Sequence, residues 1–147
     1  MGTPATTILS ALRRTYRRTR REYSDRLAPL DLTPRQAAVI LALATQPGTR
    51  LGALAEKVGA DQPTISALVD RLVERGLVGR EADPADRRRA CLRLTPAAGS
   101  LAGDIQQIRA AMDRQLIELL GEAPGRQLLD SLNELAARLD QQHEVKG

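Results

Sequence analysis

Phenylalanine and tryptophan are absent from this sequence, and tyrosine occurs only twice. A hydrophobic core must therefore be built from leucine, isoleucine, valine and alanine, and leucine and alanine are good helix formers. This composition favours a mainly helical fold in which helices pack on helices. The 147 residues are enough for one domain with a core of its own.

Cysteine and histidine each occur once, as Cys91 and His143. One cysteine excludes an intramolecular disulfide, and His143 has no histidine or cysteine nearby with which to bind a metal ion. We find no paired nucleophile and base and no glycine-rich phosphate loop. We therefore predict no cofactor and no metal site, and we do not expect an enzyme.

Long apolar stretches are also missing. None approaches the roughly 20 residues that span a bilayer, and the first residues lack the pattern of a signal peptide. We therefore expect a cytoplasmic protein that does not associate with a membrane.

The charges are distributed unevenly. Residues 1–32 contain seven arginines and three acidic residues, residues 33–95 contain ten basic and seven acidic residues, and residues 96–147 contain five basic and eight acidic residues. The excess of positive charge therefore lies before residue 96, and residues 96–147 reduce it to the net charge of +4. This distribution favours a polyanionic partner, most commonly nucleic acid. A solvated, arginine-rich surface is the alternative.

Apolar residues at helical spacing predict a series of helices. The expected ranges are 5–28, 34–44, 50–58, 62–75, 96–121 and 125–143. Thr33 and Gln36 form the pattern of a capping box, Asp61 can cap the helix that follows it, and Gly59 lies in the joint between two short helices. Ala123-Pro124-Gly125 is expected to break the last two helices apart.

The spacing changes between the fourth and fifth helices. Residues 90–94 alternate as in a strand, and turn-forming residues at 83–86 separate them from Leu77 and Val78. A β-hairpin with a polar, basic loop is predicted. Two short helices followed by a hairpin are the order of a winged helix-turn-helix.

The predicted organisation is a mainly α fold with a small β-hairpin wing. Residues 31–95 form the winged helix-turn-helix DNA-binding domain. The long helices outside it carry apolar stripes that so small a domain cannot cover. Mutual burial of these stripes across a two-fold axis would cover them, so residues 1–30 and 96–147 are interpreted as a dimerisation region.

The second helix of such a motif enters the major groove with its N-terminal residues at the base edges. Residues that need not face the core include Gln62, Pro63, Thr64, Ser66 and Arg71. Their short polar groups and one guanidinium suit hydrogen bonds to bases or phosphates. Ordinary polarity at a helix start is the alternative interpretation of Gln62.

The predicted hairpin loop contains Asp86, Arg87, Arg88 and Arg89. Guanidinium groups are attracted to narrow minor grooves, where the potential is most negative. Asp86 can hold one of these arginines by a charge-assisted hydrogen bond. A charge run exposed only to solvent is the alternative.

Several of these stretches resemble the MarR family of winged helix-turn-helix transcription regulators. The similar segments are Leu77–Arg80, Asp83–Arg88 and Leu92–Thr95 for the wing, Gln62–Ser66 and Leu68–Leu72 for the recognition helix, and Leu32–Pro34 with Gln36 for the second helix. The wing segments are the specific part. A reactive cysteine in the first helix, as in the peroxide-sensing branch of that family, is absent.

This resemblance implies an obligate homodimer that binds a pseudo-palindromic operator. It implies that Arg88 enters the minor groove, that Asp86 braces the wing, and that Gln62, Thr64, Ser66 and Arg71 lie at the major groove. It further implies a repressor that a small, often aromatic or phenolic, ligand releases from DNA after binding between the dimerisation and DNA-binding lobes.

Some residues allow two interpretations. Tyr16 and Tyr23, seven residues apart on one helix, either line a ligand pocket or pack at the dimer interface. Cys91 is either a small buried residue or a redox switch, and the arginines of residues 13–21 either approach DNA or are solvated. A thiol-based redox regulator acting through Cys91 and a non-specific architectural DNA-binding protein are therefore alternatives to a ligand-responsive repressor.

Overall fold

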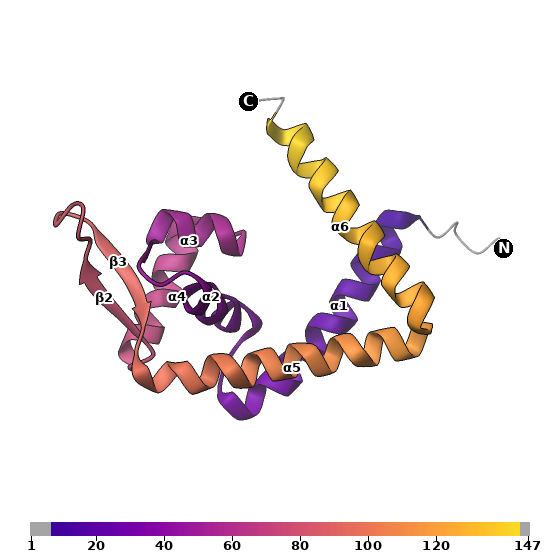
Figure 1. Ribbon diagram of the computed structural model, residues 1–147, viewed down its shortest axis with the longest axis horizontal. Coiled ribbons are helices and arrows are strands. Elements are labelled where there is room, and N and C mark those ends of the chain that lie inside the picture. The colour runs from indigo at the N-terminus through magenta and orange to yellow at the C-terminus, as the bar shows by residue number, and fades with distance from the viewer. Residues whose placement is uncertain (1–6, 145–147) are drawn as a thin grey trace. The chain divides into compact units, whose positions relative to one another are not determined.

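The computed structural model describes residues 7–144 and is mainly helical, as predicted (Figure 1). Its elements in chain order are α1 (Ile8–Leu27), the 3-10 helix η1 (Ala28–Leu30), α2 (Pro34–Thr45), β1 (Thr49–Arg50), α3 (Leu51–Val58), α4 (Gln62–Glu74), β2 (Val78–Ala82), β3 (Ala90–Leu94), α5 (Pro96–Leu120) and α6 (Glu122–Glu144). The chain forms two compact units, which meet within α5 between Ile108 and Arg109.

The predicted N-terminal caps of α2 and α4 are confirmed. The Thr33 hydroxyl accepts a hydrogen bond from the Gln36 backbone N–H, and the Gln36 side chain accepts one from the Thr33 N–H. Asp61 likewise caps α4 by accepting a bond from the Thr64 N–H. Each cap satisfies backbone donors that an α-helix leaves unpaired in its first turn.

Glycines end two helices where the backbone turns left-handed. Gly59 (φ 73°) follows α3, and Gly121 (φ 92°) separates α5 from α6. The expected break at residues 123–125 is wrong, because these residues form the first turn of α6. Pro124 is tolerated there, since a first-turn residue needs no backbone donor. A side chain on Gly125 would lie 3.0 Å from the Ile117 Cα, so this glycine allows α5 and α6 to approach each other closely.

The hairpin of β2 and β3 is confirmed, and β1 adds a third strand that the sequence analysis missed. The sheet order is β1-β3-β2, with both pairs antiparallel. Residues 83–89, which we call the wing loop, connect β2 to β3 at the free end of the hairpin (Figure 1). Because β3 is central, Cys91 has Arg50 on one side and Glu81 on the other.

A hydrophobic core of leucine, isoleucine, valine and alanine holds the first unit together. It includes residues of α2, α3 and α4, both hairpin strands and the start of α5. Ala37, Ile40 and Leu41 of the predicted α2 stripe are buried, but Ala44 is exposed and Val39 is buried instead. Helix α2 is thus buried on more sides than a single stripe predicts.

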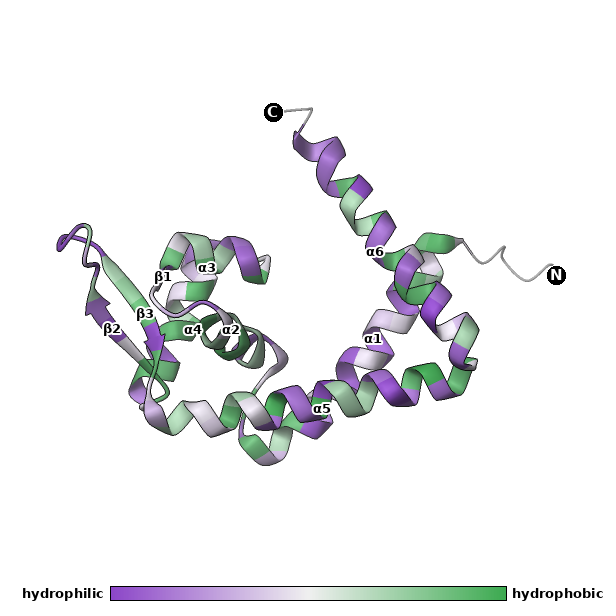
Figure 2. Ribbon diagram, viewed as in Figure 1, coloured by the Kyte–Doolittle hydropathy of each residue, from purple (hydrophilic) through white to green (hydrophobic). Residues whose placement is uncertain are grey.

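The second unit contains the end of α5 and all of α6. The predicted α6 stripe is present, but Leu128, Leu132, Leu135 and Leu139 remain 38–48% exposed. Figure 2 shows hydrophobic positions recurring along this helix between hydrophilic ones. Among the helices of residues 7–144, none has the length and apolar character needed to cross a membrane.

Candidate nucleic-acid interface

Helix α4 presents one face to the core and another to solvent. Ile65, Val69 and Leu72 are buried, whereas Leu68 is only half-buried. The candidate residues all lie off the buried face: Gln62, Pro63 and Arg71 are exposed, and Thr64 and Ser66 are half-buried. The exposed part of α4 therefore carries the polar groups that the sequence analysis selected.

Thr64 is more constrained than its neighbours. Its backbone N–H and its hydroxyl donate to the two carboxylate oxygens of Asp61, each at 2.8 Å. These hydrogen bonds, backbone first, lower the pKa of Asp61, and the charge of Arg35 adds a smaller lowering. The Thr64 hydroxyl proton is thus engaged in the helix cap, and only the acceptor capacity of its oxygen is left for a ligand.

Two further contacts orient the exposed side of α4. The Gln62 amide lies against α3, where a Cβ added to Gly52 would lie 3.2 Å from Nε2. Asp70, on the exposed side of α4, forms an ion pair with Arg80 of β2. The hairpin and α4 are therefore joined by a charge-assisted contact on the solvent side.

The wing loop holds its arginines at the surface. Arg87, Arg88 and Arg89 are exposed. Asp86 forms an ion pair with Arg89 at 3.5 Å, which is longer than the charge-assisted hydrogen bond that the sequence predicted. It also accepts a hydrogen bond from the Arg88 backbone N–H at 3.1 Å. Asp86 thus fixes the backbone of the loop beneath the guanidinium groups.

A second wing carboxylate, Asp83, was not selected from the sequence. Its Oδ2 accepts a hydrogen bond from Arg50 Nε at 2.6 Å and forms an ion pair with Nη2 at 2.5 Å. Its Oδ1 accepts a hydrogen bond from the Ala85 N–H at 2.9 Å. The Ala85 bond, followed by that from Arg50, lowers the pKa of Asp83. Aspartate before proline is a local turn signal, but its partner lies 33 residues away and has no sequence signature.

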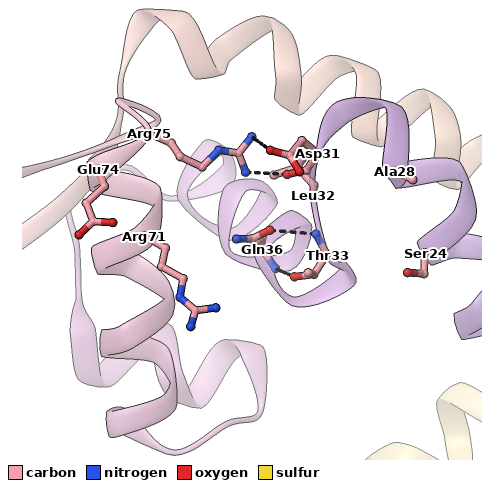
Figure 3. Close-up of a pocket in the computed structure, with 9 residues that line it drawn as sticks. All are labelled: Ser24, Ala28, Asp31, Leu32, Thr33, Gln36, Arg71, Glu74 and Arg75. Atoms are coloured by element: carbon pink, nitrogen blue, oxygen red, sulfur yellow. Dashed lines mark hydrogen bonds and ion pairs between the residues drawn. The ribbon is translucent and has the colours of Figure 1, made fainter.

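The C-terminal end of α4 is anchored as well. Arg75 donates a hydrogen bond of 2.6 Å to the carbonyl of Asp31, which has a left-handed backbone (φ 54°), and the Thr95 hydroxyl donates one of 2.6 Å to the carbonyl of Gly76. Figure 3 shows Arg75 reaching Asp31 across a pocket that Arg71 also lines. Helix α4 is thereby tied to the corner between α1 and α2 and to the start of α5.

The remaining candidates lie apart from this surface. Tyr16 is exposed on α1, whereas Tyr23 is half-buried against the core of the first unit. Cys91 is a free cysteine with 2% exposure, which restricts the access of an oxidant to its thiol. Across the part of the chain that the structure describes, no cluster of three or more His, Cys, Asp or Glu residues could hold a metal ion.

Comparison with known proteins identifies similar chains. The family model described as "MarR family" matches residues 30–89. The transcriptional regulator HosA of Escherichia coli O111:H- is 37% identical over 95 residues, which are 65% of this chain and 68% of HosA. A putative transcriptional regulatory protein for the hcr operon of Thauera aromatica is 32% identical over 104 residues, which are 71% of this chain but only 63% of the relative.

A solved structure gives a similarity over nearly the whole chain. The transcriptional repressor CouR, bound to a 23-mer DNA duplex, superimposes with a TM-score of 0.85 at 32% identity. The superposition covers 92% of this chain and 96% of CouR. The similarity therefore includes the helices outside the segment that the family model matches.

Proposed function

The chain belongs to the MarR family of winged-helix transcription regulators, and we propose that it is a homodimeric repressor that binds a pseudo-palindromic operator. In this proposal α4 enters the major groove and the wing loop reaches the adjacent minor groove. The observation that carries it is the joint placement of the exposed α4 residues and the wing arginines on one compact unit, held by Asp70–Arg80 and Arg50–Asp83.

Each candidate residue has a role in this proposal. Gln62, Ser66 and Arg71 contact base edges or phosphates in the major groove, with Pro63 against the bases and Thr64 as an acceptor. Arg88 enters the minor groove, and Arg87 and Arg89 contact the flanking phosphates. Asp86 and Asp83 touch no DNA and instead hold the loop in place.

The dimer is supported by the exposed leucines of α6. Four of them share one face of the helix at spacings of three and four residues, and each is more than a third exposed. A second copy of the chain offers the same face, and a two-fold axis lets each stripe cover the other. Two winged domains then face half-sites whose centres lie about one helical turn apart.

Release by a small ligand completes the proposal. Tyr16 and Tyr23 lie on one helix, and an aromatic or phenolic molecule could pack against either ring. A ligand that shifts α1 would act on α4 through the Arg75–Asp31 contact, which joins α4 to the corner after α1.

Selection of binding sites from fragmented genomic DNA with the purified full chain, at a stated salt concentration, tests this function. We expect recovery of a pseudo-palindrome with half-sites about 10–10.5 base pairs apart. Recovery of no motif, together with a specific-to-non-specific affinity ratio well below about 10³, would retire the repressor and favour an architectural DNA-binding protein.

A further inference from the structure

Three arginines converge on one pocket of the first unit. The contacts proposed above, to bases and in the minor groove, do not explain why these arginines lie together. Arg20 of α1, Arg35 of α2 and Arg71 of α4 line it, together with Thr33, Gln36, Thr64, Ala67 and Leu68. We call this set of residues the arginine pocket. The sequence analysis selected Arg71 and left open whether Arg20 approaches DNA, but it did not predict that the three arginines meet, since they are separated by 15 and 36 positions along the chain.

The charges of the arginine pocket are not balanced within it. No aspartate or glutamate lines it, and within residues 7–144 no hydrogen bond or ion pair engages the three guanidinium groups. In Figure 3 Arg71 extends without a bond to any other labelled residue. Asp61 is close enough to Arg35 to have its pKa lowered, but its carboxylate already accepts two bonds from Thr64.

Like charges that converge without a counter-ion repel one another, so this arrangement fits an anion. Arginine offers a planar, bidentate fork that matches phosphate geometry. The Thr33 hydroxyl can donate as well, whereas the Thr64 hydroxyl proton is already bound to Asp61. The pocket is open to solvent, since Arg20, Arg35 and Arg71 are all exposed. A phosphate on a large polyanion can therefore approach it.

The position of the arginine pocket beside α4 indicates which polyanion. Thr64, Ala67 and Arg71 follow one flank of α4 at spacings of three and four residues, and this flank faces α1 and α2. An α-helix about 10–12 Å wide nearly fills a major groove about 12 Å wide, so a sugar-phosphate backbone borders each of its flanks.

We propose that the arginine pocket binds a backbone phosphate of the DNA strand that borders α4 on the side of α1 and α2. Arg35 and Arg20 thereby extend the protein–DNA contact beyond the groove, onto α2 and α1. This inference rests on the proposed function, because it requires a duplex seated against α4. It assigns Arg20, among the arginines of residues 13–21, a DNA contact.

The salt dependence of DNA affinity tests the proposal. Fluorescence anisotropy would give the affinity of the full chain for a selected duplex and for a scrambled duplex of equal length, from low to moderate salt. We expect Arg20→Gln, Arg35→Gln and Arg71→Gln each to weaken binding to both duplexes. Each should also reduce the slope of log K against log salt by about one per half-site.

Arg13→Gln is the matched control, because Arg13 is exposed on the same helix as Arg20 and does not line the pocket. It loses the same charge, and its slope should equal that of the wild type. If Arg20→Gln and Arg35→Gln give the slope of Arg13→Gln, the proposal is overturned. Arg35→Lys keeps a point charge and should keep most of the slope, and thermal unfolding checks that each variant folds.

A chemically modified duplex locates the contact. Methylphosphonates replace charged phosphates along the backbone that borders α4, and their cost is measured with wild type and with Arg35→Gln. We expect a loss for the wild type that is absent from the variant, whereas additive losses would contradict the contact. Tight binding of inorganic phosphate to the free protein, with unchanged salt slopes in all variants, would instead assign the pocket to a free anion.

Failure of the proposed function remains distinguishable from failure of this inference. If selection recovers no motif but the salt slope on the scrambled duplex still depends on Arg35, the phosphate contact is supported and the operator-binding repressor is contradicted. If a motif is recovered and the slope does not depend on Arg20 or Arg35, the repressor is supported and the phosphate contact is contradicted.

Discussion

The two compact units differ in how they cover their apolar side chains. In the first unit Leu54, Ile65 and Leu72 are fully buried by residues of the same chain. In the second unit Leu132 and Leu135 of α6 remain more than a third exposed. The apolar residues of α4 and those of α6 recur at similar helical spacing in the sequence. Spacing therefore indicates that one face of a helix is apolar, but it does not indicate whether the same chain or a second copy covers that face. The winged-helix part of the first unit is closed, whereas Ile8 and Leu9 at the start of α1 are at least as open to solvent as the α6 stripe. We expect a second copy to cover these exposed faces.

The largest effect is expected from charged substitutions in the second unit. Leu132→Glu combined with Leu135→Glu places two charges on the α6 stripe and should convert a dimer into a monomer, with loss of operator binding. Sedimentation equilibrium measures the mass. Replacing Arg138 by glutamine on the same helix is the control, and a double variant that stays dimeric would exclude α6 from the interface.

A core substitution should behave differently from a stripe substitution. Leu72→Ala leaves a cavity in the first unit and should reduce the free energy of unfolding by about 2–5 kcal/mol, with an unchanged dissociation constant of the folded dimer. Leu135→Ala should instead raise that dissociation constant, because it removes apolar contact from the interface. Urea titrations measure the unfolding free energy, and sedimentation equilibrium measures the dissociation constant. Equal dissociation constants in the two variants would contradict the comparison.

Within the first unit, the buried base of the hairpin contrasts with its exposed tip. Arg88→Ala should leave the fold intact and weaken the free energy of operator binding by about 1–3 kcal/mol. The slope of log K against log salt should decrease by about one per half-site. The same anisotropy titration measures it. An unchanged slope would mean that Arg88 does not touch the duplex.

Asp83→Asn tests the anchor beneath that tip. Removing a negative charge near DNA should strengthen binding if the carboxylate only repels phosphates. Because Asp83 holds the wing loop to Arg50, we expect binding to weaken several-fold with an unchanged salt slope. The double variant with Arg50→Gln should lose little more than Asp83→Asn, and additive losses would show that the two residues act separately.

The smallest expected effect is on the pH dependence of stability. Hydrogen bonds lower the pKa of Asp61 and Asp83 in the folded chain, so the unfolded state binds protons more readily at acidic pH. Their contribution is present above the unfolded aspartate pKa of about 3.9 and is lost as pH falls through the lower folded values. Urea titrations between pH 7 and pH 3 should therefore show a smaller decrease in the free energy of unfolding for Asp83→Asn than for the wild type.

Short-range signals account for the parts of the fold that the sequence predicted. Thr33 and Gln36 cap α2 from within one turn, and Asp61 does the same for α4. Gly59 ends α3 because a left-handed residue is required there. Capping, turn chemistry and apolar spacing each depend on residues a few positions apart, so they can be read without knowledge of the rest of the chain.

The interface was predictable only in part. The exposed face of α4 and the wing arginines follow from the helix period and the hairpin. The residues that hold them did not, because Arg50–Asp83 spans 33 positions and Arg75–Asp31 spans 44. Strand alternation also gave no indication that the consecutive residues Cys91 and Leu92 would both be buried, or that β1 would pair with β3 across the fold.

The sequence by itself thus determined where most of the helices and the two hairpin strands lie, that the hairpin loop is basic, and that the long terminal helices are apolar on one side. Only the tertiary structure decided that Asp83 and Arg50 meet and that Arg20, Arg35 and Arg71 line one pocket. The physical reason is distance along the chain. Local hydrogen bonds form between neighbours in sequence, whereas these contacts exist only after the core of the first unit brings α1, α2, α4 and the hairpin together.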